Sequence, residues 1–181
     1  MGRHDSPLTP EGLTIAAEVA RLLDGEIITA VYSSPLGRAV ASTRVYTQGL
    51  GMPITLVEAM AELAFGEWEG LLRIVAKPPP GRLRAFWDER PPGGESYRDA
   101  EDRVGAFIRE LGEVRGTGTF LVVGHAGVNR VFLRLWMGLE PDYAVRLLCP
   151  HDSVFILNGP GRVVTRSLTK GDFEGLLVDP E

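Results

Sequence analysis

The stretch that decides the fold is Leu121-Val-Val-Gly-His125-Ala-Gly-Val128, an apolar run that ends in a histidine and a small Ala-Gly pair. Its β-branched residues predict a buried strand, and the residues after His125 predict a helix that begins at once. A helix start presents unpaired backbone N–H groups and a positive dipole end, which favour an anion. The stretch therefore predicts an anion site at His125, although a histidine that merely caps the helix would show the same pattern.

Strand and helix patterns alternate along the rest of the chain. Thr9 can cap a helix that begins at Pro10, and small and apolar residues recur there at helical spacing until Gly25. The predicted helices cover 10–24, 35–48, 96–111 and 128–137, and the predicted strands cover 27–32, 52–57, 120–124, 154–157 and 163–168. This alternation predicts an α/β fold with three layers, α/β/α, and a mainly parallel sheet whose ligands bind beyond the carboxyl ends of its strands.

Length and composition predict one domain that spans residues 1–181. Within it, the stretch 58–97 contains proline-rich breakers and lacks a regular pattern, which is typical of a lid or binding loop. The net charge of -5 argues against a general partner of nucleic acid or of a membrane surface. Cys149, the only cysteine, is interpreted as a small apolar residue, and the expected location is the cytoplasm.

Arg38 lies in a second junction between a predicted strand and a predicted helix, Tyr32-Ser-Ser-Pro-Leu-Gly-Arg38. From the first turn of that helix, its guanidinium can reach over the sheet edge and hold a phosphoryl group with two parallel hydrogen bonds. Taken alone, the residue is better interpreted as an ordinary surface arginine, which is the usual place of arginines.

Glu62 opens the segment Glu62-Leu-Ala-Phe-Gly66-Glu-Trp68-Glu-Gly70. Phosphoryl transfer to or from an alcohol needs a proton donor for the leaving oxygen, and a bound dianion raises the pKa of a carboxyl group beside it. Glu62 is therefore a candidate general acid and base. Glu67 and Glu69 are alternative candidates, for which a solvated loop position is the favoured interpretation.

Together these pieces resemble the histidine phosphatase superfamily, also called the phosphoglycerate-mutase-like family. Five motifs match in order: P-L-T-x-x-G at 7–12, S-P-x-x-R-A at 34–39, E-x-x-F-G-x-W-E-G at 62–70, P-G-G-E-S at 92–96 and the second-histidine motif at 123–127. The W-E-G and P-G-G-E-S forms resemble its broad-specificity and α-ribazole phosphatases more than its glycolytic mutases. The resemblance implies that Arg38 binds phosphate, that His125 stabilises the transferring phosphoryl group, and that Glu62 is the general acid and base.

The family's nucleophile is the histidine of an R-H-G motif at the end of the first strand. Arg3-His4 does not match that motif, because no apolar strand precedes it and Asp5 follows in place of glycine. The run 2–9 instead fits the family's later G-x-x-D-x-P-L-T segment, so Arg3 and His4 are interpreted as decoys. We therefore expect the first central strand to be absent, with either an open place or another segment beside the strand that ends at Gly124.

Two functions follow as hypotheses. The first is a phosphomonoester hydrolase that uses a phosphohistidine intermediate in its complete form, acts on a small phosphorylated metabolite and needs neither metal nor cofactor. The second is a non-catalytic pseudo-phosphatase that binds a phosphorylated ligand, and a phosphoglycerate-mutase-type phosphotransferase is a further alternative.

Without its nucleophile the chain as written is expected to be inactive or weak. A displaced His4 nucleophile ranks lower, because a flexible terminus would orient it poorly. Specificity is expected from the stretch 58–97, where four basic residues could meet a second anionic group: Arg73, Lys77, Arg82 and Arg84.

Overall fold

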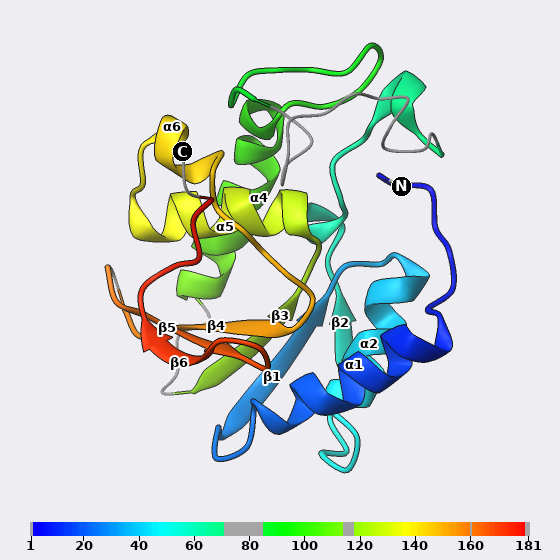
Figure 1. Cartoon of the computed structure of the whole chain (residues 1–181), viewed down its shortest axis with the longest axis vertical. Helices are drawn as coiled ribbons and strands as arrows, with labels where there is room; N and C mark the ends of the chain where they lie inside the picture. The colour runs from blue at the N-terminus through cyan, green and yellow to red at the C-terminus, as the bar shows by residue number, and fades with distance from the viewer. Residues whose placement is uncertain (1, 71–84, 114–117, 160, 180–181) are drawn as a thin grey trace.

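The computed structural model describes residues 2–70, 85–113, 118–159 and 161–179, and Figure 1 shows their arrangement. The helices are α1 (Pro10–Arg21), α2 (Gly37–Tyr46), α4 (Tyr97–Glu113), α5 (Ala126–Met137) and α6 (Pro141–Ala144), with short 3₁₀ helices at Glu58–Met60 (η1) and Gly66–Trp68 (η2). The strands are β1 (Ile28–Ser33), β2 (Ile54–Leu56), β3 (Thr119–Val123), β4 (Ser153–Leu157), β5 (Val163–Ser167) and β6 (Gly171–Glu174). The predicted α/β class is confirmed.

Strand β1 shows how the helices cover both faces of the sheet. Successive side chains of a strand point to opposite faces. The Ser33 hydroxyl accepts a hydrogen bond from Thr43 of α2, while the neighbouring Tyr32 ring packs edge-on against Phe107 of α4, with 5.5 Å between ring centroids. Helix α2 therefore lies on one face and helix α4 on the other, which gives the predicted three-layer α/β/α arrangement.

The strands form two separate three-stranded sheets. The first has the order β2-β1-β3 with parallel pairing, and the second has the order β4-β5-β6 with antiparallel pairing. Within the described ranges, β3 pairs only with β1 and β4 only with β5. Over these ranges, the second edge of β3 is therefore unpaired, and the expected absence of a first central strand stays a prediction.

The two sheets lie between the same layers of helices. On one face, Phe120 and Val122 of β3 pack against the same apolar core as Phe155 and Leu157 of β4. On the opposite face, Arg166 of β5 donates hydrogen bonds to the Leu22 carbonyl and the Glu26 carboxylate, which closely follow α1. The free edges of β3 and β4 thus both border one continuous core, and unpaired edges of this kind are sites where a further strand can pair.

Several boundaries differ from the prediction. Ile27, predicted to lie in a buried strand, precedes β1 and is 81% exposed. Helix α5 begins at Ala126 rather than Val128, because His125 already has the extended backbone of a capping residue. The short elements α6 and β6 were not predicted, since four residues are too few to show an apolar period.

The predicted lid is described only in part. Its described residues form η1, η2 and loops, and the Trp87 ring stacks on Tyr97 at 4.8 Å, which anchors the second loop to the core. Residues 71–84, which include all four basic residues proposed for specificity, lie outside the described ranges. In the described ranges, no helix has the length and apolar character required to cross a membrane.

Candidate phosphate-binding site

His125 lies where the carboxyl ends of β1 and β3 meet. The parallel pairing of the two strands brings Ser34, just after β1, beside the end of β3, and the Ser34 amide donates a hydrogen bond to the Val123 carbonyl at 2.8 Å. The Ser34 hydroxyl lies 2.8 Å from Nε2 of His125. The first predicted site residue therefore occupies the expected sheet edge, next to the start of α5.

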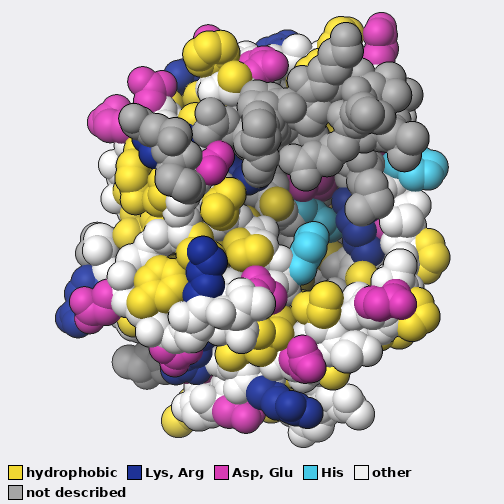
Figure 2. Space-filling view, viewed as in Figure 1, with side chains coloured by type: hydrophobic (Ala, Val, Ile, Leu, Met, Phe, Trp, Pro, Cys, Tyr) yellow, Lys and Arg dark blue, Asp and Glu magenta, His cyan; other side chains and the backbone are white. Residues whose placement is uncertain are grey.

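Burial keeps the His125 imidazole neutral. Loss of solvent lowers its pKa from 6.5 to about 4; the positive charges of Arg38 and His151 act in the same direction, and the negative charges of Glu62 and Asp5 oppose them. A neutral imidazole has one N–H to donate and one nitrogen that accepts. Histidine and basic side chains lie close together near the centre of the face shown in Figure 2.

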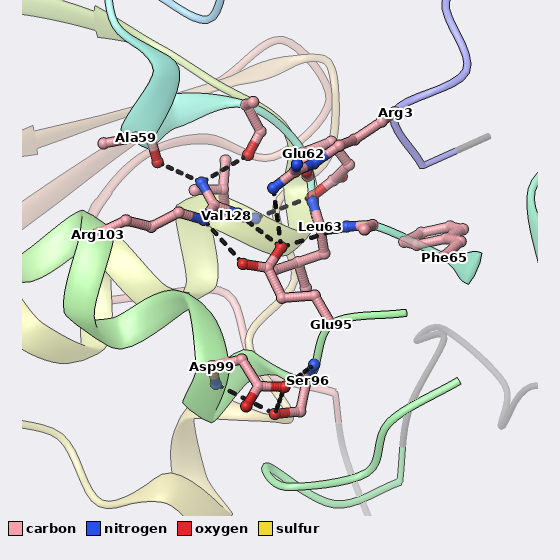
Figure 3. A network of polar contacts seen from close by, with 12 residues as sticks. Arg3, Ala59, Glu62, Leu63, Phe65, Glu95, Ser96, Asp99, Arg103 and Val128 are labelled. Atoms are coloured by element: carbon pink, nitrogen blue, oxygen red, sulfur yellow. Dashed lines mark hydrogen bonds and ion pairs between the residues drawn. The ribbon is translucent and has the colours of Figure 1, made fainter. Parts of the chain in front are cut away.

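Glu62 is buried, with 8% of its surface exposed, and binds the start of α5 (Figure 3). Its carboxylate accepts hydrogen bonds from the amides of Leu63 at 2.9 Å, Val128 at 3.1 Å and Gly127 at 3.2 Å. A Cβ at Gly127 would lie 2.4 Å from the Glu62 carboxylate, so only glycine permits this approach. The predicted acid and base is thus beside His125, and in this structure it neutralises a helix N-terminus.

Arg38 lies in the first turn of α2, as predicted, and its side chain is only 11% exposed. One guanidinium nitrogen, Nη1, donates to the His4 carbonyl at 3.0 Å and to the Asp5 carboxylate at 3.2 Å, and Nη2 donates to the Gly2 carbonyl at 2.7 Å. A phosphoryl group that binds Arg38 through Nη1 has to replace the His4 carbonyl or the Asp5 carboxylate.

Asp5 also occupies the N-terminus of α2. Its carboxylate accepts hydrogen bonds from the backbone amides of Gly37 and Arg38. Slight burial raises the pKa of Asp5, but the amides of Arg38 and Gly37 and the charge of Arg38 outweigh it and lower that pKa overall. The helix start beside Arg38 therefore already holds an anion supplied by the chain itself.

Residues 2–5, here called the N-terminal strap, are also held from the opposite side. Glu69 accepts hydrogen bonds from the amides of Arg3 at 2.9 Å and His4 at 3.0 Å, and Nε of Arg3 donates to the Glu62 carbonyl at 3.1 Å (Figure 3). His4 takes part through its backbone, and no hydrogen bond of its imidazole occurs within the described ranges. Arg3 and His4 thus lie near the site, with the His4 side chain making none of these contacts.

A second group of charged residues positions the Glu62 segment. Arg103 of α4 donates two hydrogen bonds to the Glu95 carboxylate, at 2.9 and 3.0 Å, and also binds the carbonyls of Ala59 and Ala61 (Figure 3). Glu95, the acidic residue of the P-G-G-E-S run, accepts the Ala64 amide at 3.2 Å. These contacts anchor both sides of Glu62.

Sequence reasoning assigned no role to Ser34, Asp5, Glu95 or Arg103. Ser34, Asp5 and Glu95 lie inside the family motifs given above, and this position was the one signal in the sequence that could have identified them. Their partners are 31 to 91 residues away in the sequence. Over the described ranges, no group of three or more histidine, cysteine or acidic residues is placed to hold a metal ion. The independence from metals remains a prediction.

Comparison with known proteins gives a consistent result. The family described as "Histidine phosphatase superfamily (branch 1)" matches residues 1–165. The adenosylcobalamin/alpha-ribazole phosphatase of Escherichia coli is 27% identical over 146 residues, which are 78% of this chain and 72% of that protein. A Salmonella choleraesuis protein named "Probable phosphoglycerate mutase" is 31% identical over 159 residues, which are 81% of this chain and 70% of that protein.

Solved structures share the fold. A mycobacterial glucosyl-3-phosphoglycerate phosphatase, determined in complex with inorganic phosphate, superposes with a TM-score of 0.73 at 23% identity, over 98% of this chain and 89% of its own. Bacillus stearothermophilus YhfR superposes with a TM-score of 0.70 at 23% identity, over 99% of this chain and 87% of its own.

Proposed function

The chain belongs to the histidine phosphatase superfamily, and from that premise we propose that it binds small phosphomonoesters and, once a nucleophilic histidine is supplied, hydrolyses them without a metal ion. The observation that carries the proposal is the convergence of Ser34, Arg38, Glu62 and His125 at the carboxyl edge of β1 and β3. No other arrangement in the described ranges joins a helix start, an arginine and a histidine at the end of a parallel sheet.

The proposed roles follow from the chemistry of each group. The Arg38 guanidinium exchanges the strap carbonyls for phosphoryl oxygens, because a dianion is a stronger acceptor than a neutral carbonyl. His125 donates its N–H to the transferring phosphoryl group, and binding of a dianion raises its pKa. Glu62 keeps the start of α5 in place, and we assign to it the protonation of the leaving alcohol oxygen.

We place the nucleophile on a strand that pairs with the free edge of β3. That edge ends beside His125, so a histidine at the end of a parallel neighbour would face the same phosphoryl group. The family resemblance implies such a strand, and the apolar core that β3 and β4 share on one face of the sheet would receive its side chains.

A non-catalytic ligand-binding role is the second candidate. It is favoured because neither histidine at the site is placed as a nucleophile. Of the three histidines of the chain, His125 is hydrogen-bonded to Ser34, and His4 makes only backbone contacts at the site. A phosphotransferase of the mutase type is a third, favoured by the name of the Salmonella choleraesuis relative.

Hydrolysis of a generic aryl phosphate separates these functions. We expect the chain to bind inorganic phosphate and to hydrolyse the ester weakly, and any activity should be lost in His125→Ala and retained in His4→Ala. The proposal fails if His4→Ala alone abolishes turnover and phosphorylated His4 can be trapped by denaturing the chain at alkaline pH and identified by mass spectrometry.

A further inference from the structure

A cavity adjoins the candidate site at the start of α5. It has a volume of about 380 Å³ and includes Ala126, which directly follows His125. Its polar lining comes from α5 and from the β4 to β6 sheet: Arg130, Asp152, Ser167, Thr169 and Lys170.

Arg130 has an uncompensated charge in this cavity. It is 6% exposed, and its guanidinium donates to two backbone carbonyls, that of Leu147 at 2.6 Å and that of Ala126 at 3.1 Å. Within the described ranges, no carboxylate lies within 4.0 Å of it. A buried charge without a counter-ion is strongly unfavourable, so this site favours the binding of an anion.

The neighbouring groups do not supply the missing negative charge. Burial raises the pKa of the Cys149 thiol to about 11, so the thiol stays neutral beside Arg130. Asp152 is the one carboxylate of the described lining. It accepts hydrogen bonds from the hydroxyl groups of Ser153, Ser167 and Thr169. These hydrogen bonds outweigh its partial burial and lower the pKa of Asp152. With Lys170 opposite, the lining has two positive charges and one negative charge.

We propose that this cavity binds a second anionic group of the ligand whose phosphoryl group binds at Arg38 and His125. The inference rests on the proposed function for the identity of the ligand. Nε and Nη1 of Arg130 bind carbonyls, which leaves Nη2 to donate to an anion, and Lys170 adds an ammonium group to the lining. A bis-anionic phosphate ester would then extend from the candidate site past the start of α5 into this cavity.

The test uses inorganic phosphate and amide NMR spectra of the full chain. We expect two saturable sets of shifts, one at the amides of Gly37 and Arg38 and one at those of Thr169 and Lys170. Lys170→Gln and the conservative Arg130→Lys should each weaken the second set about three- to tenfold and leave the first unchanged. Arg162→Gln, which removes an equal charge from an exposed turn outside the cavity, is the matched control.

The outcomes separate the two proposals. If only the Gly37 set appears, the second site is overturned while the proposed function stands. If only the Thr169 set appears, the proposed function fails. Equal weakening by Lys170→Gln and Arg162→Gln would also overturn the second site, because it would show general attraction to positive charge.

Discussion

The two sides of the candidate site satisfy their charges in different ways. Glu62 is buried and its three amide partners all belong to the site itself, at Leu63, Gly127 and Val128. The acceptors of the Arg38 guanidinium, in contrast, come from the N-terminal strap. Two of these three contacts are exposed to solvent.

The Glu62 contacts are therefore in place before a ligand binds, whereas the Arg38 contacts are exchanged for contacts with the ligand. The Glu62 contacts orient the helix start before any ligand arrives, and such prior orientation is what makes electrostatic stabilisation effective. The Arg38 contacts are hydrogen bonds from a guanidinium to oxygen atoms. A phosphoryl group offers the same kind of acceptor and can replace them. Glu62 variants should therefore change mainly stability, and Arg38 or strap variants mainly affinity.

The largest effect is expected from Glu62→Ala. It leaves three amides of a tightly packed region without their acceptor, and each such loss costs about 1 kcal/mol or more. Chemical denaturation should show a free energy of unfolding about 4 kcal/mol below that of the unmodified chain. Glu67→Ala, at an exposed position of the same segment, is the control and should stay within about 0.5 kcal/mol. Equal losses in both variants would contradict the comparison.

Acidification tests the His125 environment. Because the pKa is about 4 in the folded chain and 6.5 for a histidine in water, the unfolded chain binds more protons between these pH values. The contribution of neutral His125 is therefore complete above pH 6.5 and is lost as pH falls to about 4, by at most about 3 kcal/mol. Plots of the free energy of unfolding against pH should differ in slope between the unmodified chain and His125→Gln in this window. Parallel curves would show that burial of His125 does not set its pKa.

Arg38→Ala should weaken the binding of inorganic phosphate by about 2 kcal/mol, or roughly thirtyfold, because it removes a charged donor pair from the ligand. Isothermal titration calorimetry provides the measurement. Arg44→Ala, at an exposed position in the last turn of the same helix, should bind phosphate unchanged. Equal weakening in both would mean that α2 attracts phosphate only through its overall charge.

The smallest effect is expected at the strap. Removal of residues 1–4 frees Arg38 from two carbonyls and should strengthen phosphate binding by about 1 kcal/mol, or roughly fivefold. His4→Ala retains the backbone carbonyl and should bind phosphate like the unmodified chain. Weaker binding by the shortened chain would show that the strap supports the site instead of competing for it.

The sequence alone was enough to establish the fold class, the two strand-to-helix junctions and the family, because these depend on local patterns and on motif order. Ser34, Arg38 and His125 each lie at the end of a predicted strand or the start of a predicted helix, so their place at the sheet edge followed from topology. The absence of a first central strand is still a prediction, which rests on a motif that the chain does not match.

Only the tertiary structure decided what these residues contact. Glu62 reaches an α5 amide 65 residues away, Arg38 binds carbonyls more than 30 residues before it, and Arg130 lacks a carboxylate partner within the described ranges. None of these pairings has a local signature, because they depend on how separate elements pack and on which polar groups that packing leaves buried. A strand-to-helix junction can be predicted from neighbouring residues, whereas the partner of a buried charge is set by the whole fold.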